Sequence, residues 1–324
     1  MTQRVSKKLV HKYYKEWIEL YKKGAVRHST YLKYELAYQH LKRLCPNLHM
    51  NELNRKRYQL LLNEYAKDHV RETTMDFHHH LKAAFVDAYE DGLIKQDPTR
   101  KAIIKGKPKV DKKKKFLDLF ELKALMQQLD LPEDQVNWDW FVYLISKTGL
   151  RFAEALALTP NDFDFKGKQI IINKSWNYKF GGGFQPTKNE SSNRKVIVDP
   201  SLLKNFKRLL KGLDPNAPIF VKDNQKIFNS TINSRLNTLC KRAGISPITI
   251  HGLRHTHASL LLFSGVSILS VSKRLGHAST LTTQKTYLHI IQELENKDNN
   301  KVLKHHETHN RYYLLFLHPI KNFG

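Results

Sequence analysis

The stretch from His251 to Tyr287 contains side chains suited to holding and cutting a phosphodiester. His251 and Arg254 are three positions apart, so on a helix both side chains leave one face about one turn apart. The arginine fork matches two phosphate oxygens, and an imidazole adds a hydrogen bond or carries a proton near neutral pH. This pair therefore predicts a site for a small anion, and phosphate is the natural ligand.

A second histidine and a tyrosine complete the stretch. His277 follows Leu275 and Gly276, a helix-stop signal that predicts an exposed bend, and Tyr287 stands further on in a helical context. A tyrosine hydroxyl has a reference pKa of about 10, so as a nucleophile it needs nearby positive charge or a base. Taken singly, each of these residues more often belongs to a solvated face or to core packing.

A further arginine lies upstream, in the segment TGLRFAEALAL over residues 148–158. Arg151 is expected in the first turn of a helix, where unpaired backbone N–H groups add positive potential. Glu154, three positions later, can hold this arginine in one rotamer. An ordinary surface ion pair has the same spacing, so the segment gains meaning only beside the downstream residues.

The ordered series of an arginine box, H-x-x-R, L-G-H and a helical tyrosine resembles the signature of the tyrosine recombinases, the phage-integrase family. The resemblance is specific from Arg151 to Tyr287 and weaker over residues 8–98. It implies that the tyrosine attacks a DNA phosphate to form a 3′-phosphotyrosyl link, and that neither a cofactor nor a metal ion takes part. The catalytic residues that it implies are Arg151, Lys188, His251, Arg254, His277 and Tyr287, with Glu154 in support.

The family also carries a catalytic lysine on a β-hairpin. Lys188 precedes the turn-forming segment NESSN and resembles that residue, which implies that it protonates the departing 5′ oxygen. Lys174 and Lys195 remain alternatives, because the length of such hairpins varies.

The elements that must position these residues are mostly helical. Apolar residues at helical spacing predict four helices that form a small domain over residues 1–98. β-Branched alternation in QIIINKS and RKVIV predicts a small antiparallel sheet. The expected fold class is mostly α with a small antiparallel β-sheet. The resemblance implies a helical core-binding, SAM-like domain followed by an α+β catalytic domain over residues 116–300.

Two further segments are less regular. Residues 99–115 are basic and are interrupted by Gly106 and Pro108, which predicts a linker that could lay lysines on a duplex. The tail, residues 301–324, has an aromatic cluster that could dock on a partner subunit or have no role. Many integrases carry an additional amino-terminal arm-binding domain, and whether this protein binds arm sites is left open.

The charge predicts the class of partner. The 324 residues contain 55 Lys+Arg against 30 Asp+Glu, a formal net charge of +25, which favours a polyanion. Nucleic acid is the first candidate and an anionic membrane surface the second. No apolar run approaches the ~20 residues that span a bilayer, and no signal peptide is apparent, so a soluble intracellular protein is expected. The family resemblance implies a cytoplasmic, nucleoid-associated protein of a bacterium or phage.

Some sites can be argued against from the sequence. Cys45 and Cys240 are too few for a disulfide framework or a metal cluster. Residues 78–80 are three histidines, and on a helix their side chains point in different directions, so they are not expected to share a metal ion. They are expected on a solvated or DNA-facing surface. No carboxylate cluster for Mg²⁺ and no nucleotide-binding loop are apparent.

The resemblance implies double-stranded DNA with specific recombination sites as the partner, a homotetramer on that DNA, and accessory DNA-bending or directionality factors. A type IB topoisomerase would use similar residues but rejoin the same strand. A DNA-binding protein without catalysis would explain the charge but not the ordered series of residues, and a membrane-surface protein would explain the charge alone. The direction of reaction, integration, excision or resolution, is left open.

Overall fold

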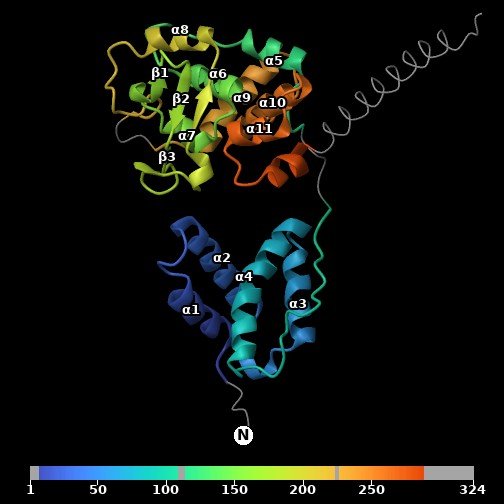
Figure 1. Ribbon diagram of the computed structural model, residues 1–324. Helices are drawn as coiled ribbons and strands as arrows, with labels where there is room; N and C mark the ends of the chain where they lie inside the picture. Colours follow the sequence, from blue (N-terminus) through green and yellow to red (C-terminus); the bar gives the residue numbers. More distant parts are fainter. Residues whose placement is uncertain (1–6, 109–113, 223–225, 288–324) are drawn as a thin grey trace, which may run out of the picture. The chain divides into compact units, whose positions relative to one another are not determined.

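The computed structural model describes residues 7–108, 114–222 and 226–287 (Figure 1). The chain divides into two compact units, residues 1–112 and residues 113–324. Among the described residues, no helix combines the length and the apolar character that crossing a membrane requires.

The amino-terminal unit is built from four α-helices, as the apolar spacing predicts. Aromatic side chains fill its core, with Tyr14, Tyr58 and Phe85 fully buried, and α4 packs against the other three helices. The second helix begins at His28 without a side-chain cap. The helices are α1 (Val10–Tyr21), α2 (His28–Leu44), α3 (Arg55–Ala66) and α4 (Arg71–Glu90), with a 3-10 turn, η1 (Met50–Glu52), before α3.

The histidine run in α4 is only partly on the surface. His78 is buried, and its Nδ1 lies 2.9 Å from the hydroxyl of Tyr58, whereas His79 is exposed. The expectation of a solvated or DNA-facing run is therefore wrong for His78, because that position of α4 faces the core.

The segment after α4 continues along the amino-terminal unit. Arg55 donates from Nε to the carbonyl of Arg100 at 3.1 Å, and the side chain of Gln59 bonds to both backbone groups of Ile103. Residue 107 forms a bridge with Val70. Residues 99–107, the first part of the segment expected as a linker, are thus attached to α3 and to the start of α4.

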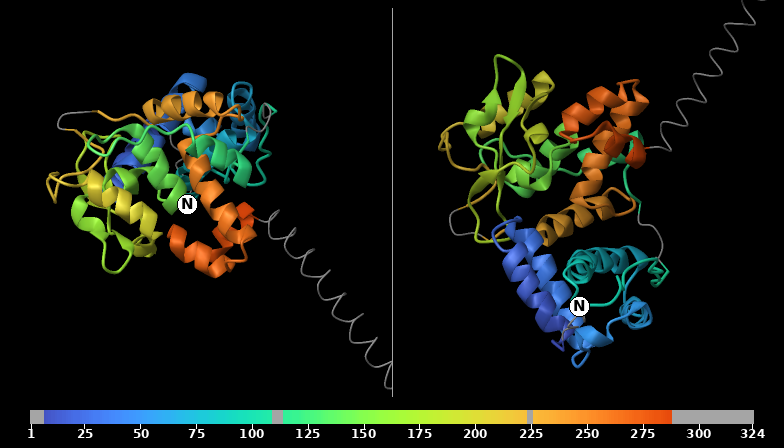
Figure 2. Two further views of the ribbon diagram at one scale, coloured as in Figure 1. Left: turned by 90° about the horizontal axis from the view of Figure 1, so that it is seen from above. Right: turned by 60° about the horizontal axis from the view of Figure 1, so that its bottom comes forward.

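The carboxy-terminal unit combines helices with two small sheets. Figures 1 and 2 show its strands on one side and α9 to α11 on the other. The helices are α5 (Leu119–Met126), α6 (Trp138–Thr148), α7 (Phe152–Leu156), α8 (Pro200–Leu209), α9 (Asn229–Arg242), α10 (Ile250–Phe263) and α11 (Ile268–Leu275), and the chain is helical again from residue 280 to 287.

The strands form two sheets where the sequence suggests one. The first sheet has the order β1-β2-β5 and pairs Ile170 with Val196, and the second is the antiparallel pair β3-β4. Three glycines with positive φ, residues 181–183, lie in the connection from β3 to β4. The strands are β1 (Phe163–Asp164), β2 (Gln169–Ile172), β3 (Lys174–Trp176), β4 (Phe184–Pro186) and β5 (Arg194–Ile197), and the 3-10 turns η2 (Pro160–Asp162) and η3 (Glu190–Ser192) precede β1 and β5.

Helix α6 lies at the centre of the unit's core and packs against α10. Asn137 caps its start by accepting from the N–H groups of Asp139 and Trp140, and Gly149 ends it with a φ of +68°. A side chain at Gly149 would also be crowded, because a Cβ there would lie 2.7 Å from Cδ2 of His257. The end of α6 therefore requires glycine for conformation and for space.

Candidate active site

Arg254 lies on the buried face of α10 with only 3% of its surface exposed. Its guanidinium donates to the carbonyl of Gly149 at the end of α6 and to the carbonyl of Leu275 at the end of α11, both at 2.7 Å. Burial, together with the charge of Arg151, lowers the pKa of Arg254 to about 9, so the group is still charged at pH 7. Two backbone carbonyl oxygens therefore hold the guanidinium group of Arg254 in place.

Arg151 is the N-cap residue of α7, one position before the first turn where the sequence suggests it. Its guanidinium donates to the carbonyl of Gly276 at 2.6 Å and to Oε1 of Glu154 at 2.7 Å. The contact with Glu154 is the one that the spacing predicts. Arg151 and Arg254 therefore hold the carbonyls of consecutive residues, Gly276 and Leu275.

Arg194 in β5 is a third arginine of this cluster, and the sequence did not single it out. It pairs with Glu154 through Nη2 and Oε2 at 2.9 Å, and its Nε donates to the carbonyl of Arg274 at 2.6 Å. Although burial alone would raise it, the charges of Arg194 and Arg151 hold the pKa of Glu154 below its ordinary value. Glu154 therefore joins α7 to β5 as well as orienting Arg151.

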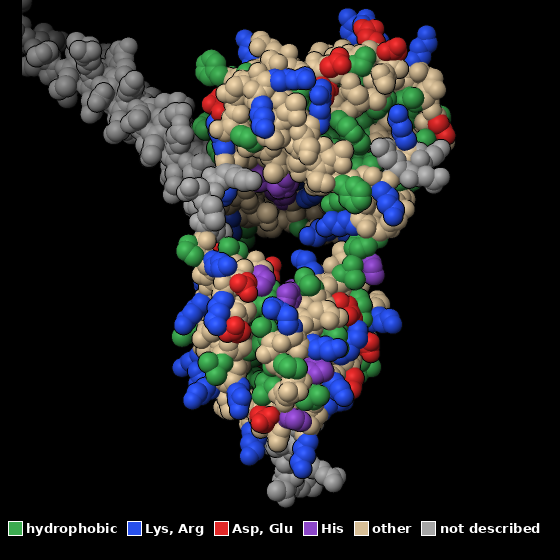
Figure 3. Space-filling model, turned by 180° about the vertical axis from the view of Figure 1, so that it is seen from behind, with side chains coloured by type: hydrophobic (Ala, Val, Ile, Leu, Met, Phe, Trp, Pro, Cys, Tyr) green, Lys and Arg blue, Asp and Glu red, His purple; other side chains and the backbone are tan. Residues whose placement is uncertain are grey.

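The two expected histidines occupy the ends of their helices. His251 is in the first turn of α10 and is exposed, and His277 follows α11 with its Nδ1 2.8 Å from Oγ1 of Thr283. Partial burial of the rings, then the charges of Arg254 and Arg151, lowers the pKa of both imidazoles, that of His277 to about 4. Both rings are therefore neutral at pH 7. Because the charges of Arg151 and Arg254 lower the pKa of both histidines, the four side chains form one electrostatic cluster. Figure 3 shows histidine side chains recessed in the surface of this unit beside lysine and arginine side chains.

Tyr287 is 2% exposed and packs with Ala258 and Leu262 of α10 and with apolar residues of α11. Its hydroxyl lies 2.9 Å from Nδ1 of His255. Burial raises the pKa of Tyr287 to about 12, against the opposing charge of Arg254. His255 was not expected in the site, although its position one turn after His251 on the same helix face could have indicated it.

Lys188 lies in the connection between β4 and η3, exposed to solvent. The sequence suggested that this connection is the turn of a single hairpin. It is not, because β4 and β5 belong to different sheets. Lys174 is held by both carboxylate oxygens of Asp162 at 2.6 Å, and Lys195 is exposed on β5. Lys174 is thus fixed in a close ion pair with Asp162.

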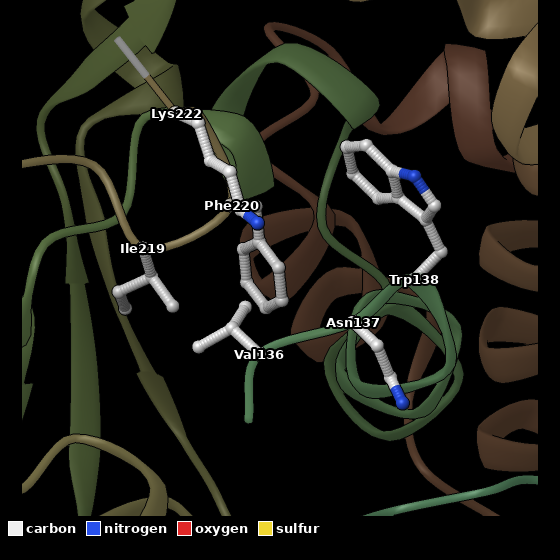
Figure 4. Close-up of a pocket in the computed structure, with 6 residues that line it drawn as sticks. All are labelled: Val136, Asn137, Trp138, Ile219, Phe220 and Lys222. Carbon is white, nitrogen blue, oxygen red and sulfur yellow. The ribbon is translucent and has the colours of Figure 1, made fainter. Parts of the chain in front are cut away.

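Within the described ranges, no three His, Cys, Asp or Glu side chains lie together so that they could hold a metal ion. A pocket of about 260 Å³ opens elsewhere in the unit, where Trp138, Phe220 and Val136 surround it (Figure 4). None of the residues named above as site residues lines it.

A comparison with protein families decides the class. Residues 115–293 match the model of the phage integrase family. The chain belongs to this family. It is 26% identical over 322 residues to the integrase of Staphylococcus phage L54a, with 89% of this chain and 91% of the relative covered. The resemblance stated from the sequence is thereby confirmed, and the chain is a tyrosine-type site-specific DNA recombinase.

Solved structures show the same fold. The integrase of transposon Tn1549 in complex with transposon right end DNA has a TM-score of 0.71 at 22% identity, with 86% of this chain and 95% of that chain covered. A lambda integrase tetramer bound to a Holliday junction has a TM-score of 0.62 at 17% identity, with 86% and 79% covered. The fold class expected from the sequence, mostly helical with small antiparallel sheets, is therefore confirmed.

Proposed function

We propose that this integrase family member recombines the ends of a mobile DNA element at specific sites, with Tyr287 as the nucleophile. The observation that carries the assignment is the pair of hydrogen bonds from Arg151 and Arg254 to the consecutive carbonyls of Gly276 and Leu275, directly before His277. Two guanidinium groups held in this way present fixed positive charge to one small anion, which a phosphoryl group requires as it is transferred.

In the proposed reaction, the hydroxyl oxygen of Tyr287 attacks the scissile phosphorus and the bond to the 5′ oxygen breaks. Lys188 gives that oxygen its proton, and Arg151, Arg254, His251 and His277 hold the non-bridging oxygens. The product is a 3′-phosphotyrosyl link, which a 5′-hydroxyl of a partner strand later attacks. Because the link conserves the energy of the broken bond, the cycle requires neither ATP nor a metal ion.

The partner in this proposal is double-stranded DNA that carries recombination sites, in the cytoplasm or nucleoid of a bacterial host. The net charge of +25 and the DNA present with the Tn1549 and lambda integrases support it. Residues 1–98 would bind DNA as a core-type domain and residues 116–300 would carry the chemistry. The lambda integrase tetramer supports a tetramer on DNA, and accessory bending or directionality factors would set the direction. The tail, residues 301–324, lies outside the described residues.

Covalent capture tests the assignment. A nicked duplex with the junction sequence of the encoding element, incubated with EDTA, should trap the wild-type protein as a covalent complex. Tyr287→Phe should bind the same duplex but remain uncoupled, because only the hydroxyl is lost. Capture of the Phe variant would place the nucleophile elsewhere. An assay for exchange between two sites separates a recombinase from a topoisomerase, which would restore only the original strand.

A further inference from the structure

His255 contacts the atom that reacts. Its Nδ1 lies 2.9 Å from the hydroxyl oxygen of Tyr287, and its ring lies edge-on to that of His251 with 4.6 Å between the centroids. The tyrosine ring is packed among apolar side chains of α10 and α11, so the direction of its hydroxyl is set by this hydrogen bond.

The surroundings of His255 determine its protonation. Cationic or titratable groups face it from each neighbouring element: His251 and Arg254 from α10, Lys115 from the segment before α5, and His277 from the turn after α11. Burial, and then His251, Arg254 and Lys115, lower the pKa of His255 to about 4. The ring is therefore neutral at pH 7, and Nδ1 accepts a hydrogen bond from the tyrosine when the ring proton is on Nε2.

We propose that His255 is a further catalytic residue of this site, which accepts the proton that the Tyr287 hydroxyl loses during attack. The inference rests on the proposed function. As the bond from the tyrosine oxygen to phosphorus forms and the bond from phosphorus to the 5′ oxygen breaks, the hydroxyl proton moves to Nδ1 of His255, and Lys188 supplies a proton to the 5′ oxygen. When a 5′-hydroxyl later attacks the link, Lys188 takes the proton of that hydroxyl, the bond from phosphorus to the tyrosine oxygen breaks, and the proton on Nδ1 returns to the tyrosine oxygen.

Binding of the substrate makes His255 a stronger base. A phosphodiester held by Arg151 and Arg254 brings a negative charge into the group of cations that keeps the imidazole of His255 neutral. That charge favours the protonated ring at the stage when the tyrosine must lose its proton. Burial raises the pKa of the Tyr287 hydroxyl, so the hydroxyl needs a proton acceptor in direct contact with it in order to react at neutral pH.

The test measures single-turnover formation of the covalent complex on one nicked duplex, with EDTA, between pH 6 and 9. His255→Leu removes the acceptor, and should lower the rate at pH 7 on the order of 10²-fold while leaving affinity for the duplex unchanged. Without a local base, the rate of this variant should rise about tenfold per pH unit, because hydroxide must take the proton. His255→Asn offers an amide oxygen in place of Nδ1 but no basic nitrogen, and should show the same steep dependence even if it binds the hydroxyl.

Each result decides between roles. A wild-type rate in His255→Leu, or a loss of equal size at every pH in both variants, would overturn the proposal, since a structural role has no pH signature. An Asn variant with the wild-type pH profile would overturn it too, because an acceptor alone would then suffice. If wild-type protein forms no covalent complex, or Tyr287→Phe still does, the proposed function itself fails. A loss confined to His255 variants leaves that function standing.

Discussion

Arg151 and Arg254 come from different helices, yet their guanidinium groups donate to the carbonyls of adjacent residues at the end of α11. The turn before His277 is therefore the common support of both arginines. Any change that moves this turn is expected to displace both of the arginines that we propose to contact the phosphate.

Replacement of either arginine by lysine should slow cleavage strongly. An ammonium cannot donate to a fixed carbonyl and to a phosphate in the geometry of a planar fork, so Arg151→Lys and Arg254→Lys should each lower the rate of covalent capture on the order of 10²-fold. Near-normal capture by a folded variant would remove that arginine from the site. The exposed Arg208→Lys is the matched control, and should cleave as wild type does.

The role of Lys188 can be separated from simple phosphate binding. Lys188→Ala should cleave an ordinary phosphodiester poorly but cleave well when a bridging 5′-phosphorothiolate is used, because sulfur leaves without a proton. Lys195→Ala, on the neighbouring strand β5, should treat both substrates alike. If Lys195→Ala were the variant rescued by sulfur, the assignment would pass to that lysine.

Glu154→Gln should destabilise the carboxy-terminal unit by about 3 kcal/mol at pH 7, because two arginines lose their buried counter-charge. The pKa of Glu154 is depressed in the folded protein, so its contribution is present above the ordinary value of 4.5 and is lost as the pH falls through the lower folded value. The difference between variant and wild type in urea unfolding should therefore shrink below pH 4.5. Glu133→Gln, in an exposed pair with Arg208, should change little at any pH.

Gly149→Ala should destabilise the protein more than Gly265→Ala. Both glycines have a positive φ, +68° and +87°, so both substitutions strain the backbone. Only at Gly149 would the new Cβ also press against the ring of His257, whereas nothing lies within 4 Å at Gly265. Thermal unfolding of the two variants measures the difference, and equal losses would show that α10 yields to the methyl group.

The sequence predicts the local parts of this site well. Arg151 with Glu154, and His251 with Arg254, are pairs within one turn, and the glycine after Leu275 marks the end of a helix. Their spacing is a property of the chain that needs no tertiary information.

Contacts between distant segments could not be read in the same way. Arg194 looks like any charged residue at the start of a strand, and its burial against Glu154 depends on how β5 lies beside α7. The bond from His255 to Tyr287 depends on the packing of the tyrosine helix against α10. The division into two sheets could not be predicted either. Alternation in β2 and β5 predicts strands, but it does not indicate that β3 and β4 pair with each other in a separate sheet.

The partners of Arg194 and Arg254 have different electrostatic consequences. Arg194 is in a direct ion pair with the carboxylate of Glu154, which it shares with Arg151. Arg254 is instead held by the carbonyl dipoles at the carboxyl ends of α6 and α11, which favour a cation without carrying a formal charge. Among the described residues, Arg254 is thus a buried guanidinium that no ion pair ties directly to a carboxylate, and in the proposed reaction an incoming phosphate would supply that direct partner.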